Sequence, residues 1–187
     1  MKINLRNHNE CTKKTICTFI FLSILFIASF ALSSSSSIKP AENFNLPDIY
    51  DGSKVYSLSD FRGRPVLLNI WASWCSNCKK EMSQLIEIQK KYEQSEFSII
   101  AVNIDNHKDK ALKFLNKLDK KTGRKLNYLV LYDGEKAVPK AYYPLGIPAT
   151  YLIDEKGILT KNYFGSFSKS GLLQLESDIN DMVGKAK

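Results

Sequence analysis

The chain contains few of the residues that build disulfide scaffolds and metal sites. Its 187 residues include four cysteines and two histidines. Cys11 and Cys17 lie in or beside an apolar N-terminal run, so only Cys75 and Cys78 belong to the folded part. Two cysteines do not form the framework of a disulfide-rich fold. A structural zinc site needs four ligands, and besides these sulfurs the folded part offers only His107 and carboxylates.

Negative charge is the scarcer sign. There are 19 acidic residues against 27 basic ones, a formal net charge of +8. Apart from a basic N-terminus, the surplus is spread along the chain and does not form a stripe with interleaved aromatic residues. This pattern predicts a solvated basic surface and no nucleic-acid partner. No internal repeat is evident, and the length allows one ordinary domain but hardly two.

The longest charge-free run lies near the N-terminus and indicates export. Residues 15–32 carry no charge, which is long enough for a signal-anchor helix, while Ser29 and Ala31 keep a cleaved signal peptide open. The basic residues before this run predict that residues 1–14 stay in the cytoplasm and that the rest crosses the membrane. Five serines open a Ser-rich linker at residues 33–40. The folded domain is expected at residues 41–187.

Hydrophobic patterning in this domain predicts an α/β fold with a sheet between helices. Two short strands around Asp51-Gly52 form an expected hairpin, and two unbroken apolar runs, Val66–Ile70 and Phe97–Ile104, are typical of buried parallel strands. Three further strands are expected at Asn127–Leu131, Thr150–Ile153 and Ile158–Phe164. Helices are expected at about Ser76–Gln94, Lys108–Lys121, Glu135–Tyr142 and Ser168–Val183, with Gly123 ending the second.

Cys75 and Cys78 stand where a buried strand gives way to a helix. A cysteine at a helix N-terminus faces unpaired N–H groups and the positive end of the helix dipole, and both favour the thiolate. We therefore predict that Cys75 is a nucleophile and that Cys78, one turn deeper, resolves the mixed disulfide it forms. The alternatives are two inert core cysteines or half of a zinc site. Inert cysteines would not need a helix start, and the zinc site lacks its full set of ligands.

Several blocks of the sequence together resemble one family. The segment from Asn43 to Met82, the Asn-Ile-Asp run at Asn103–Asp105 and the run Leu145–Gly157 are similar to the membrane-anchored thioredoxin-like TlpA/ResA oxidoreductases. The resemblance implies a thioredoxin-like fold, in which helices flank a central mixed sheet and an N-terminal β-hairpin and a central insertion are added. It also implies a cis peptide between Ile147 and Pro148 beside the cysteines, whose exposed backbone would pair with a substrate chain.

Three further positions are assigned in the light of this resemblance. Glu81 matches the acidic residue that the group places after the second cysteine, and it is interpreted as a catalytic residue that tunes the thiol protons; the alternative is an ordinary solvated helix residue. Trp74 is interpreted as an apolar wall for the docking substrate, beside Ile147 and Pro148. Asn69 stands where cytosolic thioredoxins carry a buried aspartate, so proton transfer needs another route.

The function predicted from these residues is an extracytoplasmic thiol-disulfide oxidoreductase on the periplasmic side of the inner membrane. The resemblance implies protein substrates with cysteine pairs, either apocytochrome c or copper-handling proteins of cytochrome oxidase assembly, and a membrane thiol reductase as electron donor. No cofactor or metal beyond the redox disulfide is expected. The alternative is a copper-binding assembly factor that uses the two thiolates, since soft sulfur ligands suit Cu(I).

Overall fold

The structure is a computed structural model that describes residues 39–123 and 126–186. Ile38–Lys187 forms one compact unit. The predictions for the basic N-terminus at 1–14, for the anchor or signal peptide at 15–32 and for residues 33–38 of the linker lie outside the described residues. Within the described ranges, no helix combines the length and the apolar character needed to cross a bilayer.

A five-stranded mixed sheet forms the centre of the domain, with strand order β5-β4-β3-β6-β7. Its strands are β3 (Val66–Trp71), β4 (Ser98–Asn103), β5 (Leu129–Tyr132), β6 (Ala149–Ile153) and β7 (Leu159–Phe164). The first three are parallel to one another, and β6 and β7 run antiparallel to their neighbours. The two apolar runs predicted as buried parallel strands are β3 and β4, and both are buried at every residue.

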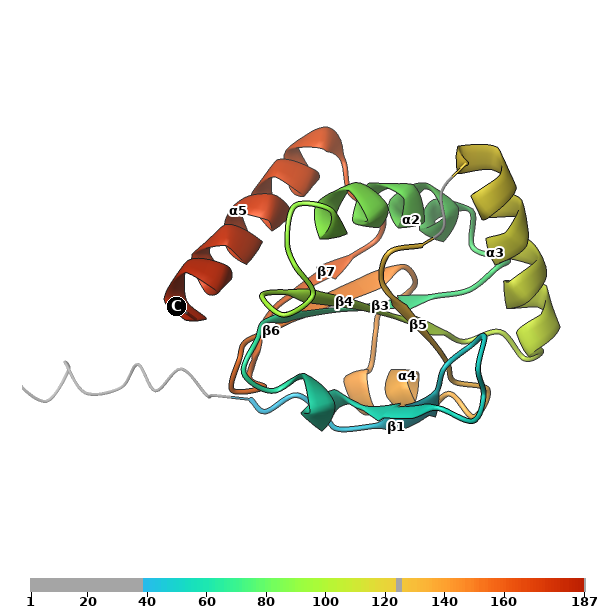
Figure 1. Cartoon of the computed structure of the whole chain (residues 1–187), viewed down its shortest axis with the longest axis horizontal. Coiled ribbons are helices and arrows are strands. Elements are labelled where there is room, and N and C mark those ends of the chain that lie inside the picture. Colours follow the sequence, from blue (N-terminus) through green and yellow to red (C-terminus); the bar gives the residue numbers. More distant parts are fainter. Residues whose placement is uncertain (1–38, 124–125, 187) are drawn as a thin grey trace, which may run out of the picture. The chain divides into compact units, whose positions relative to one another are not determined.

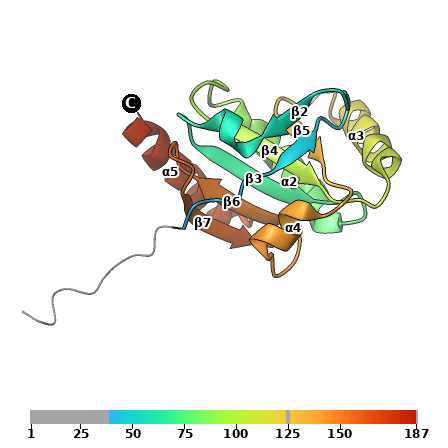
Figure 2. The ribbon, with the colours of Figure 1, turned by 90° about the horizontal axis from the view of Figure 1, so that it is seen from below.

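Helices cover both faces of this sheet. Three helices, α2 (Ser76–Gln89), α3 (Lys108–Thr122) and α5 (Lys169–Ala186), lie on one face (Figure 1). The short helix α4 (Ala137–Tyr142), the 3-10 helix η1 (Leu58–Phe61) and the predicted hairpin of β1 (Asn45–Pro47) with β2 (Val55–Ser57) lie on the other, as Figure 2 shows. This arrangement confirms the thioredoxin-like fold with its added hairpin.

Side chains of β3 alternate between two hydrophobic cores. Leu67 and Trp71 pack on the face of α2, α3 and α5, whereas Leu68 and Ile70 pack on the face of α4 and the hairpin. The alternation follows from the period of two residues along a strand. Asn69, between Leu67 and Trp71, therefore points toward α2, and it is the polar residue in this strand. A buried amide in this position needs hydrogen-bond partners.

The ends of two helices show where the hydrophobic pattern predicts a helix boundary correctly and where it does not. Helix α3 ends at the predicted Gly123, which adopts a left-handed conformation with φ of 63°. Helix α2 ends at Gln89 and not near Gln94 as predicted. At this end, the Gln89 side chain accepts a hydrogen bond from the Ile99 amide and donates one to the Phe97 carbonyl. Strand β5 begins opposite Ile100, so the Ile99 amide would otherwise lack a partner.

Candidate redox site

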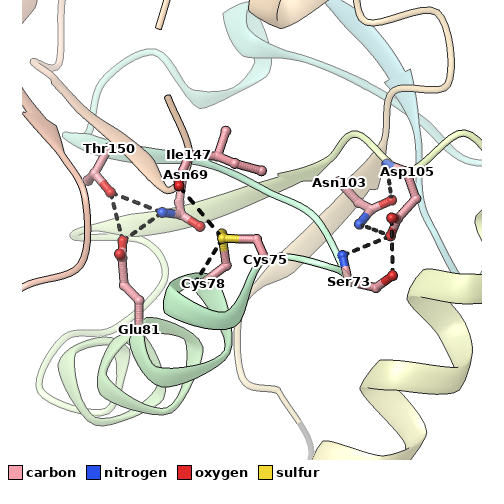
Figure 3. Close-up of a disulfide and its surroundings, with 9 residues drawn as sticks. All are labelled: Asn69, Ser73, Cys75, Cys78, Glu81, Asn103, Asp105, Ile147 and Thr150. Atoms are coloured by element: carbon pink, nitrogen blue, oxygen red, sulfur yellow. Dashed lines mark hydrogen bonds between the residues drawn. A yellow bond between two sulfur atoms is a disulfide. The ribbon is translucent and has the colours of Figure 1, made fainter. Parts of the chain in front are cut away.

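The cysteine pair lies where β3 gives way to α2, as predicted. Cys75 is the N-cap residue of α2, and its Sγ accepts a hydrogen bond from the Cys78 amide at 3.1 Å. The two cysteines form a disulfide (Figure 3). Cys75 is 7% exposed and Cys78 is 1% exposed. The first sulfur is thus the one that a partner can reach, and an N–H group is in place to stabilise its thiolate after reduction.

The loop before β6 closes one side of the disulfide. The peptide bond between Ile147 and Pro148 is cis, as the resemblance implies. The Ile147 carbonyl oxygen lies 3.7 Å from Cys75 Sγ. An extended chain that reacts with Cys75 would therefore meet the backbone of this loop. Trp74 is 65% exposed beside the pair, which leaves its face free for a partner; its role in substrate binding stays a prediction.

Glu81 is buried one helical turn after Cys78 and is not a solvated helix residue, so that alternative is wrong. It is 1% exposed. Its Oε1 accepts hydrogen bonds from Asn69 Nδ2 at 2.8 Å and from Thr150 Oγ1 at 2.9 Å, while its buried Oε2 has no partner among the described residues. Burial raises the pKa of Glu81 to about 7, against the opposing effect of these two hydrogen bonds.

This position makes Glu81 suited to proton transfer. Glu81 follows Cys78 by three residues on α2, so both side chains lie on the same buried face of the helix. A carboxyl with a pKa of about 7 is a mixture of acid and carboxylate at neutral pH and can either give or take a proton. Thr150 belongs to the run Leu145–Gly157 quoted for the family resemblance, but its contact with Glu81 was not predicted, because strand pairing is what places it opposite Asn69.

A second polar cluster fixes the loop that leads into Cys75. Asp105 is buried and accepts hydrogen bonds from the Ser73 amide at 3.0 Å, from Ser73 Oγ at 3.1 Å and from Asn103 Nδ2 at 2.9 Å. In the view of Figure 3, this cluster lies on one side of the disulfide and the Glu81 cluster on the other. Asp105 belongs to a run quoted for the family resemblance, but its positioning role was not predicted.

The described part of the chain contains no group of three or more His, Cys, Asp or Glu side chains that could hold a metal ion. His107 is exposed at the start of α3, where its side chain makes no capping hydrogen bond. The position of the Cys75–Cys78 pair at the start of α2 supports exchange between its disulfide and an incoming thiol.

Comparison with protein families agrees with this chemistry. The family model described as Redoxin matches residues 36–182. The chain belongs to the Redoxin family. Among curated members, the chain is 32% identical over 134 residues to the thiol-disulfide oxidoreductase ResA of Bacillus thuringiensis, covering 72% of this chain and 73% of that protein. It is 34% identical over 128 residues to the thiol:disulfide interchange protein DsbE of Vibrio cholerae, covering 68% of this chain and 64% of that one.

Solved structures place this Redoxin member among thioredoxin-like proteins. A crystal structure of a thiol:disulfide interchange protein DsbE from Chlorobium tepidum superimposes with a TM-score of 0.70 at 30% identity, over 79% of this chain and 97% of that one. A protein disulfide isomerase from Bacteroides thetaiotaomicron gives a TM-score of 0.65 at 27% identity, over 78% and 89%. The chain is thus a thiol-disulfide oxidoreductase of the TlpA/ResA type.

Proposed function

We propose that this Redoxin protein works outside the cytoplasm and passes electrons from Cys75 and Cys78 to disulfides of partner proteins. The observation that carries the proposal is the disulfide at the start of α2, with Cys75 as the reachable sulfur and an amide donor already 3.1 Å from it. A thiol kept as thiolate at neutral pH can attack a disulfide without a separate base.

In the first step, the Cys75 thiolate of the reduced protein attacks one sulfur of the partner's disulfide. A bond forms between Cys75 and that sulfur, the partner's disulfide breaks, and the other partner sulfur leaves as a thiolate. The Ile147 carbonyl, 3.7 Å from Cys75 Sγ, accepts a backbone N–H of the partner next to its cysteine. Recognition at this point depends on the main chain and tolerates different partner sequences.

In the second step, Cys78 breaks this mixed disulfide. Its thiol must first lose a proton, and Glu81 in its carboxylate form accepts it on the same buried helix face. The Cys78 thiolate then attacks Cys75 Sγ, which forms the disulfide seen in the structure and releases the partner's second thiolate. The partner is reduced by two electrons and this protein is oxidised by two.

The partners proposed are proteins with cysteine pairs that must be reduced in an oxidising compartment, either apocytochrome c or copper-handling proteins of cytochrome oxidase assembly. A membrane thiol reductase would restore the Cys75 and Cys78 thiols. The charge-free residues 15–32 support a place on the outer side of the inner membrane, either anchored or released after cleavage. If this protein instead oxidised its partners, Cys75 and Cys78 would act in the same way, and an electron acceptor would replace the membrane thiol reductase.

Trapping with Cys78→Ser tests this function. The variant keeps the nucleophile and lacks the resolving thiol, so partners should remain attached through Cys75 and be released by a reducing agent. Cys75→Ser is the matched control, because it has lost the nucleophile and should capture no protein. Mass spectrometry identifies the trapped proteins. Equal capture by both variants would contradict the roles given to the two cysteines.

A copper-binding assembly factor is the alternative function. Two thiolates are suitable Cu(I) ligands, but the described residues bring no third sulfur or histidine beside the pair. Stoichiometric Cu(I) retained by the purified reduced protein, and lost in Cys75→Ser, would favour this alternative over electron transfer.

A further inference from the structure

A basic groove lies next to the redox loop, and the reaction proposed above does not use it. It has a volume of about 280 Å³ and is lined by Ser73, Lys79, Lys110, Lys113, Phe114 and Lys117. Three of these lysines share one face of α3 because they follow one another at spacings of three and four residues. The fourth, Lys79, comes from the first turn of α2. One groove therefore collects positive charge from two neighbouring helices.

The floor of the groove is aromatic and rigid. The Phe114 ring packs against Trp71 of β3 with 5.6 Å between ring centroids. Lys79 Nζ lies 5.6 Å from the centroid of the same ring, so one ammonium group is held over this floor by a cation–π contact. A buried partner ring fixes Phe114, and the lysines around it form a charged rim.

The charges of this rim are not neutralised inside the protein. Within residues 39–123 and 126–186, none of the four lysines forms an ion pair, and all four are exposed. The acidic groups nearby are Asp109, exposed in the first turn of α3, and Asp105, which is buried and already accepts three hydrogen bonds from Ser73 and Asn103. Four unpaired ammonium groups against one exposed carboxylate leave a net positive site for an anionic ligand.

The groove lies close enough to Cys75 for a chain that reacts with Cys75 to reach it. Ser73 forms part of its wall and precedes Cys75 by two residues, so their Cα atoms are at most about 7.6 Å apart. A protein that exchanges with Cys75 must bring its own cysteine to this sulfur. An extended chain advances about 3.3 Å per residue, so residues two to four positions from the partner's cysteine can reach the lysines.

We propose that this groove binds an acidic segment of the substrate protein, located a few residues from the cysteine that reacts with Cys75. The inference rests on the proposed thiol-disulfide exchange and adds a substrate preference to it. Backbone pairing with Ile147 tolerates many sequences, whereas the lysine rim selects among them by charge. Because the rim is exposed, it acts mainly on the rate of association and is weakened by salt.

The test measures exchange rates between the reduced full-length protein, in an uncharged detergent, and three peptides. Each peptide carries one cysteine as a disulfide with neutral 2-thiopyridine, flanked at two to four residues by three glutamates, three glutamines or three lysines. The variant replaces Lys110, Lys113 and Lys117 with glutamine. The matched control replaces Lys120, Lys156 and Lys169, which are exposed and lie outside the groove. Both variants lose three positive charges.

In the unchanged protein, the glutamate peptide should react about tenfold faster than the glutamine peptide at low salt, and the lysine peptide more slowly than both. The groove variant should lose most of this preference, the control should keep it, and about 0.5 M salt should abolish it. Equal rates for the three peptides, or equal losses in both variants, would overturn the proposal. Single-stranded DNA that inhibits far more strongly than a free acidic peptide would also overturn it, because the groove would then be a nucleic-acid surface.

The small neutral disulfide 2,2′-dithiodipyridine separates this inference from the proposed function. It needs no charged groove, so all three proteins should reduce it at the same rate. If the reduced protein reacts with it no faster than Cys75→Ser, which keeps Cys11 and Cys17, the exchange activity itself is wrong. If it reacts normally while the peptides show no preference, only the acidic-segment proposal is wrong.

Discussion

Glu81 is a buried carboxyl whose second oxygen has no partner among the described residues, and the proposed second step depends on its ionisation. We expect Glu81→Gln to slow the attack of Cys78 on the mixed disulfide by about a hundredfold, because a glutamine side chain accepts no proton. In the unchanged protein this rate should rise as the pH increases through about 7, where Glu81 becomes a carboxylate. Quenched-flow measurement of peptide release between pH 5.5 and 8.5 gives both results.

The control for this prediction is the first step of the exchange. Attack by Cys75 on a neutral disulfide does not need a proton carrier at Cys78, so its rate should be similar in both proteins. Superimposable pH profiles for peptide release would contradict the role given to Glu81. A parallel loss in both steps would indicate a disturbed structure around the disulfide.

The same residue should make stability depend on pH. The pKa of Glu81 is raised from 4.5 to about 7 in the folded protein, so folding favours the protonated form. This contribution is complete below pH 4.5 and is lost as the pH rises toward and beyond 7, an effect on the order of 3 kcal/mol. Urea unfolding of the disulfide form should show that Glu81→Gln loses about 2 to 3 kcal/mol less than the unchanged protein between pH 5 and 8.

Asp178 does not confound this comparison. Burial acts to raise the pKa of Asp178, but the hydrogen bonds from Lys161, Tyr163 and Gln174 together outweigh it, so this pKa is lowered. The stability it provides is present above its ordinary pKa of 3.8 and is lost only at lower pH. Identical pH dependence in the two proteins would therefore mean that Glu81 does not titrate in this range.

The site residues that could be predicted from the sequence are those that lie close to the cysteines along the chain. Cys75, Cys78 and Glu81 lie within seven positions on one helix start, and helical spacing placed them on one face. The burial of Glu81 was not predictable, because it results from packing against Asn69 and Thr150 on two strands. Thr150 is 69 positions from Glu81 along the chain, and only the antiparallel pairing of β3 with β6 brings it there.

At the level of elements, the junction between β3 and α2 depends on Asp105 at the end of β4. Replacing Asp105 with alanine would leave the Ser73 amide and the Asn103 side-chain amide without this buried acceptor. Each such loss costs about 1–3 kcal/mol, so we expect a destabilisation of about 3 kcal/mol in urea unfolding. The loop before Cys75 would also be less fixed, and exchange with a neutral disulfide should be several-fold slower.

Ser73→Ala is the matched control for this junction. It removes only the hydroxyl that donates to Asp105 at 3.1 Å. The hydrogen bonds from the Ser73 amide and from the Asn103 side chain to Asp105 remain. We expect a loss of about 1 kcal/mol and an almost unchanged exchange rate. Equal effects of the two substitutions would show that the Asp105 carboxylate is not what orders the loop.

Some helix boundaries follow from the residue at the boundary, and others follow from contacts with distant parts of the chain. Helix α3 ends at Gly123 because the backbone adopts a left-handed conformation there. A glycine after a helical pattern indicates such an end in the sequence. At the end of α2, the Gln89 side chain forms hydrogen bonds with Ile99 in β4 and with Phe97 just before this strand. The helical pattern continued to Gln94, and nothing local marks the earlier end. The predicted order of strands and helices was correct because the hydrophobic period changes between successive elements.

For the whole molecule, charge is where sequence reasoning was least informative. The basic surplus was interpreted as evenly spread, because the lysines are scattered along the chain. Folding brings Lys79 of α2 next to Lys110, Lys113 and Lys117 of α3 around one groove. The two helices lie side by side on one sheet face (Figure 1), and it is the sheet topology that joins their charges. Whether charges on separate helices form one patch therefore cannot be predicted before the arrangement of the helices on the sheet is known.

The start of the folded unit gives the last prediction. Residues 39–42 are part of the domain: the Ala41 amide donates to the Gly157 carbonyl, and the Lys39 carbonyl accepts from the Leu159 amide. Tyr142 Oη also donates to the Glu42 carbonyl at 2.7 Å. A chain that begins at Ile38 should unfold in one cooperative transition. A chain that begins at Asn43 should be less stable by about 3 kcal/mol, because three hydrogen bonds are lost and the Tyr142 hydroxyl is left buried without its acceptor. Urea unfolding of both chains measures this difference, and equal midpoints would place the true domain boundary after residue 42.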